Sequence, residues 1–312
     1  MTEPILHHYP KSPFAEKVRL VLGYKKLAWR SVHIPMVMPK PDLLALTGGY
    51  RKTPVLQVGA DIYCDTALIC DVLEHLQPEP TLYPARGKGM ARVLAQWADT
   101  TLFWTSMAYS LSPKGVAQMF GTAGPDAAKA FGADRAAMRV ATPRIRPGDA
   151  AGAYKSYLRR LANMLEGQDF LLGAQPCVAD FAAYHGLWFT RVQTSVMADV
   201  LDATPGVLAW MDRMAAIGHA SSTRLDADAA IALAAQSTPL PVDDAAFQDD
   251  HGIALGSRVS ISGNDFGPEP TEGELVAATR MHYTLRRTDA RAGTVHVHFP
   301  RIGYVLRAAE PA

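Results

Sequence analysis

The chain has 312 residues, 48% of them hydrophobic, and a formal net charge of +1. This length accommodates a sizeable core and two or three domains. The near-zero net charge disfavours partners held by bulk electrostatics, such as duplex nucleic acid or an anionic membrane surface. No run of about 18 apolar residues and no signal-peptide pattern occurs. The three cysteines lack metal-ligand or CxxC spacing, so we expect a cytoplasmic protein with reduced thiols.

Residues 1–82 are predicted to form a small α/β domain. Residues 5–9 read as a strand, 14–23 follow helical spacing, and 29–34 read as a second strand. A strand, helix and strand with a connection this long indicate a right-handed parallel crossover. Residues 53–58 and 61–64 then flank a Gly-Ala pair, which predicts a hairpin. A helix after residue 65 completes an order of elements typical of a thioredoxin-like domain.

Residues 88–236 are predicted to be all-helical. Three amphipathic runs, at 87–111, 153–167 and 177–192, indicate a helix bundle. The part from 121 to 150 is rich in Gly, Pro and mixed charge, so we expect an irregular insertion in the bundle there.

A change of pattern near residue 237 predicts a third unit. Residues 237–250, rich in Pro and Asp, read as a linker. Residues 251–312 contain five short strand patterns separated by turn residues, which indicates a small barrel-like β domain that leans on the rest of the chain. His296 and His298 share a strand face there, but no third metal ligand is evident, so we expect no metal site.

Four motifs in order carry a resemblance to a known family. SPFAEKVR (12–19), RKTPVLQVGADIYCDTALICDVLEHL (51–76), LEGQDFLLGAQPCVADFAAY (165–184) and TPGVLAWMDRM (204–214) resemble, in this order, segments of the cytosolic glutathione transferase superfamily. The first motif is similar to the serine-type signature of its tau-like classes. The resemblance covers roughly residues 4–225 and implies a bacterial-type chain with an additional C-terminal β domain.

Ser12 has two readings. It stands before Pro13 at a predicted helix start, where its oxygen would cap backbone N–H groups. The resemblance implies a second role, in which the hydroxyl donates a hydrogen bond to the sulfur of glutathione and favours the thiolate over the thiol. The positive end of the helix favours the same anion. Tyr9 is the competing hydroxyl, because other classes of the superfamily use a tyrosine at the end of the first strand.

The resemblance implies further glutathione contacts. Thr53 and a cis Pro54 would bind the cysteinyl backbone, and Asp65 and Thr66, at a helix start, would bind the γ-glutamyl end. Lys52 and Lys40 could pair with the glycyl carboxylate. Phe14 would lie beside the sulfur, although core packing explains it equally well. These lysines could equally be solvated, and Asp65 could be a plain N-cap. Asp180 resembles part of a family folding motif, which gives it a structural role.

The resemblance implies a homodimeric enzyme that takes glutathione as co-substrate, uses no metal, and attacks a small, apolar electrophile between its domains. Conjugation is the default outcome; isomerase, lyase or dehalogenase chemistry on the same site are alternatives. A non-catalytic binding or interaction module, with its tail docking a partner, is the alternative from another class. A cysteine at position 12 would have indicated disulfide exchange, and its absence disfavours that chemistry.

Overall fold

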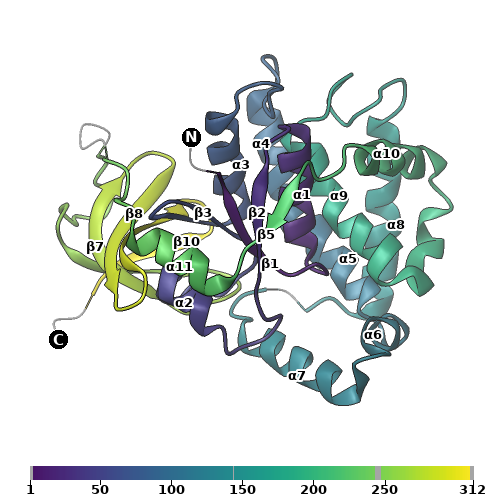
Figure 1. Cartoon of the computed structure of the whole chain (residues 1–312). Helices are drawn as coiled ribbons and strands as arrows, with labels where there is room; N and C mark the ends of the chain where they lie inside the picture. The colour runs from purple at the N-terminus through teal and green to yellow at the C-terminus, as the bar shows by residue number, and fades with distance from the viewer. Residues whose placement is uncertain (1–2, 143, 243–246, 310–312) are drawn as a thin grey trace.

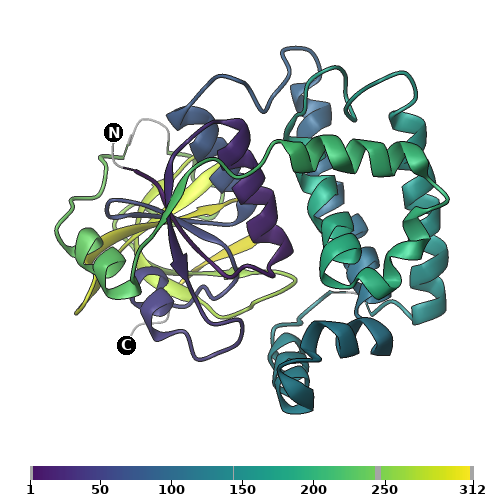
Figure 2. The ribbon, with the colours of Figure 1, turned by 45° about the vertical axis from the view of Figure 1, so that its right-hand side comes forward.

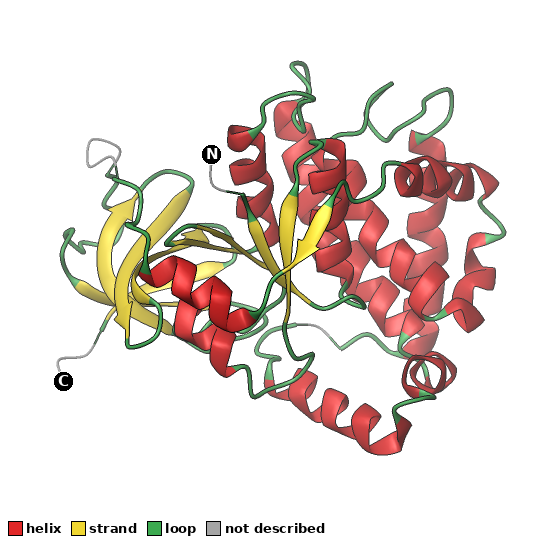
Figure 3. Ribbon diagram, viewed as in Figure 1, coloured by secondary structure: helices red, strands yellow, loops and turns green. Residues whose placement is uncertain are grey.

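The computed structural model describes residues 3–142, 144–242 and 247–309, so part of the predicted linker, residues 243–246, lies outside the described residues. None of the described helices combines the length and hydrophobicity needed to cross a membrane. The helical part lies on one side of the molecule and the strands on the other (Figures 1 and 3).

The N-terminal part has the predicted thioredoxin-like order. Its elements are β1 (Ile5–His8), α1 (Pro13–Tyr24), β2 (Trp29–His33), α2 (Pro41–Thr47), β3 (Val55–Val58), β4 (Asp61–Cys64) and α3 (Thr66–Leu76). Strand β1 pairs in parallel with β2 and antiparallel with β3, and β3 pairs antiparallel with β4. Gly59 makes the β3–β4 turn at a φ of 61°, a conformation that glycine adopts without steric cost.

The helical part surrounds one wholly buried helix, α9 (Val178–Trp188). The others are α4 (Lys88–Trp97), α5 (Phe103–Ser110), α6 (Pro113–Phe120), α7 (Gly124–Ala137), α8 (Pro147–Met164) and α10 (Pro205–Ala216). A π-helical turn at Ala98–Leu102 joins α4 to α5, and Phe189–Gln193 and Ser195–Leu201 form a second π-helical turn and a 3₁₀ helix. Figure 2 shows this group of helices separated from the strands.

The predicted irregular insertion differs from the structure, because α7 occupies much of it. Its sequence, GPDAAKAFGADRAA, is rich in alanine, the best helix former, and places a proline in the first turn, where it is tolerated. None of its residues is buried. A helix without a buried face leaves no amphipathic signature, so the pattern of apolar residues did not reveal it.

After α10 the chain returns to the first sheet. Strand β5 (Ser222–Arg224) pairs in parallel with β2, and α11 (Ala227–Ala235) follows it. The five predicted strands of the tail are β6 (Arg258–Gly263), β7 (Thr271–Ala278), β8 (His282–Asp289), β9 (Gly293–Pro300) and β10 (Tyr304–Ala308). In Figure 1 they form the curved group of strands at the left.

The tail strands continue the N-terminal sheet. Strand β9 pairs in parallel with β4, so the ten described strands form one sheet in the order β10-β6-β7-β8-β9-β4-β3-β1-β2-β5. The two parts also share one hydrophobic core, in which Val55 and Ile62 belong to the same cluster as Val297 and Phe299. The tail therefore covers an edge strand that would otherwise expose unpaired backbone groups. It leans on the N-terminal part, as the sequence predicted.

Candidate active site

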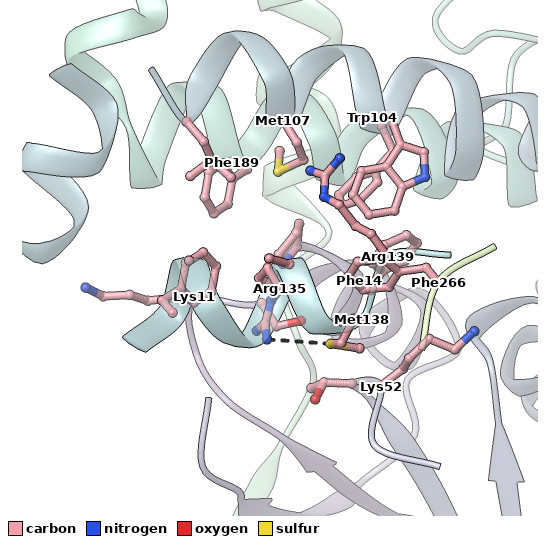
Figure 4. Close-up of a pocket in the computed structure, with 18 of the residues that line it drawn as sticks. Lys11, Phe14, Lys52, Trp104, Met107, Arg135, Met138, Arg139, Phe189 and Phe266 are labelled. Carbon is pink, nitrogen blue, oxygen red and sulfur yellow. Dashed lines mark hydrogen bonds between the residues drawn. The ribbon is translucent and has the colours of Figure 1, made fainter. Parts of the chain in front are cut away.

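A cavity of about 580 Å³ lies between the N-terminal part, the helices and the tail. This volume is in the range of small-molecule sites. The start of α1 and the loop before β3 form one wall, α5 and α7 form another, and Phe266 of the tail forms a third. Of the predicted site residues, Ser12, Phe14, Lys40, Lys52 and Thr53 line it, whereas Pro54, Asp65 and Thr66 do not. Figure 4 shows several of the lining side chains around this space.

Ser12 is the N-cap of α1 and also lines the cavity. Its Oγ accepts a hydrogen bond of 3.2 Å from the backbone N–H of Ala15, which confirms the cap. The hydroxyl proton has no acceptor among the described residues. A hydroxyl that accepts from the helix and keeps its own proton free can donate to an anion in the cavity. Capping and donation to a thiolate are thus compatible roles.

The loop that carries Ser12 is fixed from both sides. The Ser12 N–H donates to the carbonyl of Tyr9 over 3.1 Å. Arg19, in the second turn of α1, donates to the carbonyl of Pro10 over 3.0 Å and pairs with Glu16 at 2.6 Å. These contacts hold the loop, and with it the backbone of Ser12, against the first turns of α1.

Tyr9 lines the same cavity, and its hydroxyl accepts a hydrogen bond of 3.2 Å from Arg135 of α7. A phenol that accepts one bond can still donate another, so Tyr9 remains a second candidate donor. The neighbouring histidines, His7 and His8, are buried in the core. Burial lowers the pKa of His7 to about 4 and that of His8 to about 3.

The Thr53–Pro54 peptide bond is cis, as the resemblance implied. Neither the N–H nor the C=O of Thr53 has a hydrogen-bond partner among the described residues, and Thr53 lies on the cavity wall. A free donor and acceptor on one residue can pair with the backbone of a bound peptide. Pro54 itself is buried behind this wall.

The two predicted lysines are held differently. Lys40 is 4% exposed and donates to the carbonyl of Arg51 over 3.0 Å. Burial, followed by the charge of Arg135, lowers the pKa of Lys40 to about 8. Lys52 is half-buried and extends over the rings of Tyr304 and Tyr50, at 4.5 and 5.4 Å from their centroids. Lys52 is therefore positioned by the tail.

Asp65 and Thr66 lie at the start of α3. Asp65 has a φ of 77°, in the left-handed region that few non-glycine residues occupy. Such strain is tolerated where the surrounding structure fixes it, and it is frequent at ligand sites. The Asp65 carboxylate accepts from the Ala67 N–H at 2.9 Å and from the Tyr304 hydroxyl at 3.1 Å. Asp65 remains half-buried rather than enclosed, so its carboxylate can still take a ligand ammonium.

A buried polar network that the sequence did not reveal supports Thr66. The ammonium of Lys17, 0% exposed, donates to the Thr66 hydroxyl at 3.1 Å and to Asp99 at 2.6 Å. Burial alone would lower the pKa of Lys17, but nearby negative groups, Asp99 foremost, raise the pKa above its ordinary value. Asp99, on the π-helical turn, also bonds to His185 of α9 at 3.0 Å. This network joins the start of α3 to the helices.

The tail forms part of the site, and this was not predicted either. Phe266 packs on Trp104 of α5 with ring centroids 4.9 Å apart. The N–H of Gly267 donates to the carbonyl of Met138, and a side chain at Gly267 would approach Lys52 within 3.0 Å. Segments 138–142 and 265–267 are thus joined across one side of the cavity.

Phe14 lies in an aromatic group at the cavity wall, with its ring centroid 4.5 Å from those of both Phe103 and His185. It therefore serves packing and lines the cavity at once. Asp180 has the structural role expected from the sequence. Its carboxylate accepts from the N–H groups of Leu171 and Cys177 and from the Trp210 indole. The Cys177 thiol lies 3.4 Å from the same carboxylate, and its sulfur also accepts from the Asp180 N–H, so both halves of the capping box are present.

Two family models match the chain. Residues 6–81 match the N-terminal domain of glutathione S-transferases, and residues 129–217 match their C-terminal domain. A solved structure matches nearly the whole chain: a GST-like protein from Pseudomonas syringae is 42% identical, with 99% of this chain and 100% of that chain covered and a TM-score of 0.83. The chain belongs to the glutathione S-transferase family.

Two curated relatives match parts of this family member. FtsZ-localized protein A of Caulobacter vibrioides is 26% identical over 187 residues, which cover 58% of this chain and 74% of that protein. Pyrimidodiazepine synthase of Drosophila melanogaster is 33% identical over 76 residues, which cover 23% of this chain and 31% of that protein. The Pseudomonas structure covers the tail as well, so the additional strands are shared with at least one other glutathione S-transferase-like chain.

The described residues contain no group of three or more His, Cys, Asp or Glu side chains arranged to hold a metal ion. In the tail, His298 bonds to the buried carboxylate of Asp61 at 2.9 Å and to the hydroxyl of Thr284 at 2.9 Å. These bonds join β8 and β9 to β4. His298 of β9 thus takes part in attaching the tail to the N-terminal sheet.

Proposed function

We propose that the protein is a glutathione-dependent transferase in which Ser12 stabilises the thiolate of glutathione. The observation that carries the proposal is Ser12, which lines the cavity, caps α1 through its hydroxyl oxygen and has no acceptor for its hydroxyl proton among the described residues. Family membership supplies the tripeptide, because glutathione is the substrate from which the family takes its name. Ser12 is a hydrogen-bond donor in this account, never the nucleophile.

The N-terminal part, residues 1–82, binds the tripeptide in this proposal. The free N–H and C=O of Thr53 pair with the cysteinyl residue, and Phe14 lies beside the sulfur. Asp65 takes the γ-glutamyl ammonium, and Thr66 together with the start of α3 takes its carboxylate. Lys40 and Lys52, held beside the loop that carries Thr53, take the glycyl carboxylate.

The reaction that follows is a nucleophilic displacement. The thiol gives its proton to solvent, and the thiolate sulfur forms a bond to an electrophilic carbon. The bond to the leaving group breaks and its electron pair departs with that group. Each unit by which the thiol pKa falls is worth about 1.4 kcal/mol and raises the fraction of nucleophile at neutral pH. Isomerase, lyase and dehalogenase outcomes differ only in the later fate of the electrophile.

An interaction module without catalysis is the second candidate, favoured by the similarity to a relative named for its localisation with FtsZ. The tail weighs against it, because its residues enter the cavity wall and contact Asp65 instead of standing apart. Retention of the full chain on immobilised glutathione, followed by turnover of an aryl halide, tests the transferase. Failure of both would favour the interaction module.

Two further properties belong to the proposal. The family resemblance suggests a homodimer, which light scattering of the full chain would test. The three cysteines are free and buried, which suits a reducing compartment such as the cytoplasm. A fluorescent fusion expressed in its native cell would test that location.

A further inference from the structure

The cavity is strongly basic. Lys40, Arg51 and Lys52 line its glutathione side, and Lys11, Arg135, Arg139 and Arg144 line the rest. Among the residues that the structure describes, none of the lining side chains is a carboxylate. The whole chain, by contrast, has 31 basic and 30 acidic residues. The charge of the cavity is therefore a local feature that the composition concealed.

Nearby carboxylates neutralise only part of this charge. Asp134 bonds to both Arg51 and Arg135, and Glu269 of the tail pairs with Arg51 at 3.2 Å. Lys11, Arg139 and Arg144 have no carboxylate partner in the part of the chain that the structure describes.

The remaining polar contacts of these cations leave them available. Lys11 donates to the carbonyl of Met119 over 3.0 Å, which anchors it without cancelling its charge. The guanidinium of Arg139 lies 5.7 Å from the ring centroid of Trp104, and it is exposed. A planar guanidinium beside an indole can donate hydrogen bonds to an acidic group of a ligand while the indole contacts the rest of that ligand. Figure 4 shows Arg139 beside Trp104 on the cavity wall.

The same part of the cavity is also apolar. Phe103, Trp104, Met107, Phe189 and Phe266 line it. Aromatic rings and a flexible thioether suit a flat, apolar body. A ligand that matches both features has an apolar body and at least one negative charge.

Glutathione does not account for this pattern. Its glycyl carboxylate is matched by Lys40 or Lys52, and its γ-glutamyl carboxylate by the start of α3. Lys11, Arg139 and Arg144 remain, on the side of the cavity where the second substrate would bind. Resting on the proposed function, we propose that the second substrate is an aromatic electrophile that carries an acidic group such as a carboxylate, and that Arg139 binds this group.

The state of Lys40 agrees with an anion on the glutathione side of the cavity, where the glycyl carboxylate binds in the proposed function. Burial is the main cause of its pKa of about 8, and the positive charges of Arg135 and Arg51 lower the pKa further, against the opposite effect of Asp134. An anion bound beside these groups would raise the pKa of Lys40 towards its ordinary range.

A matched pair of electrophiles tests the inference. 4-Chloro-3-nitrobenzoate and its methyl ester have the same leaving group and a similar ring, but only the first is charged. We expect kcat/KM, divided by the uncatalysed rate constant with glutathione, to favour the carboxylate about tenfold at low salt. The preference should fall as salt screens the cations. Equal values for the two electrophiles, or preference for the ester, would overturn the inference.

Variants assign the effect to Arg139. Arg139→Gln should remove most of the preference for the carboxylate and leave the ester nearly unchanged, whereas Arg139→Lys should keep most of it. Arg258→Gln removes a cation that is exposed and paired with Glu272 on the tail, outside the cavity lining, and should change neither rate. An unchanged ratio in Arg139→Gln would contradict the role of Arg139.

Binding separates this inference from the proposed catalysis. 3-Nitrobenzoate and its methyl ester lack the leaving group, and their dissociation constants with the glutathione-loaded protein can be measured by calorimetry. Tighter binding of the carboxylate that weakens in Arg139→Gln supports the anion site, even if no electrophile turns over. Weaker or equal binding of the carboxylate refutes it, whatever the activity.

Discussion

The hydrogen bond from Tyr304 to Asp65 should link the tail to glutathione binding. Tyr304 is 7% exposed, and its hydroxyl lies 3.1 Å from the Asp65 carboxylate. A hydrogen bond to a charged group contributes about 1.5 to 3 kcal/mol when desolvated. Asp65 is only half-buried, so we expect about 1 kcal/mol, which is roughly a fivefold rise in the dissociation constant of glutathione for Tyr304→Phe.

Calorimetry with glutathione measures this effect, and Tyr283→Phe is the matched control. Tyr283 lies on β8, is 3% exposed, and its hydroxyl makes no hydrogen bond to the described residues. The Tyr283→Phe variant should bind glutathione with the same dissociation constant as the unaltered protein. The double variant Tyr304→Phe with Asp65→Asn should lose less binding free energy for glutathione than the sum of the losses in the two single variants, because both changes remove the same contact. Unchanged binding in Tyr304→Phe, or strictly additive losses, would refute the link.

Other predictions address the core of the site and the fold. Lys17→Met leaves Asp99 without its ammonium partner and should lower the free energy of unfolding, measured in urea at pH 7, by about 3 kcal/mol. Lys155 is exposed on α8, so Lys155→Met should leave this free energy unchanged. Equal urea midpoints for Lys17→Met and the unaltered protein would contradict the prediction. Thr53→Val keeps the main-chain contact, so the dissociation constant of glutathione should stay within about twofold; a larger rise would indicate a side-chain contact. His7 and His8 are held neutral with folded pKa values of about 4 and about 3, below the unfolded value, so the unfolded chain takes up more protons as pH falls below about 6.5. Stability should therefore be full above that pH and fall by on the order of 2 kcal/mol for each histidine by pH 5. The pH dependence of urea unfolding should be smaller in His7→Gln than in the unaltered protein. An unchanged pH dependence would show that His7 does not cause the loss of stability at low pH.

The local elements were predictable because their signals are local. The apolar alternation of the tail strands, the hairpin around Gly59 and the cap before Pro13 each depend on a few neighbouring residues. The pairing of β9 with β4 was not predictable, because it joins residues more than 230 positions apart and leaves no periodic trace in either strand. A parallel partner is chosen by the whole fold.

The candidate site divides in the same way. Ser12, Thr53 and Asp65 belong to motifs whose residues are close in sequence, so a resemblance could identify them. The buried Lys17 and the tail residue Tyr304 act through contacts with distant segments. The burial of Lys17 leaves no local signal, since lysine is rarely buried without a partner, and its partner, Asp99, is 82 residues away. The basic cavity was hidden for the same reason, because its cations come from separate segments.

The central claim is that Ser12 stabilises the glutathione thiolate, and titration of the bound thiol tests it most directly. The ultraviolet absorbance of the thiolate, followed against pH with glutathione bound, gives the thiol pKa. We predict that Ser12→Ala raises this pKa by about one unit. Ser112 caps α6 in a similar way: it precedes Pro113, and its Oγ accepts from the Gly115 N–H, but it lies outside the cavity lining. Ser112→Ala should therefore leave the thiol pKa unchanged. An identical titration in Ser12→Ala and the unaltered protein would contradict the account.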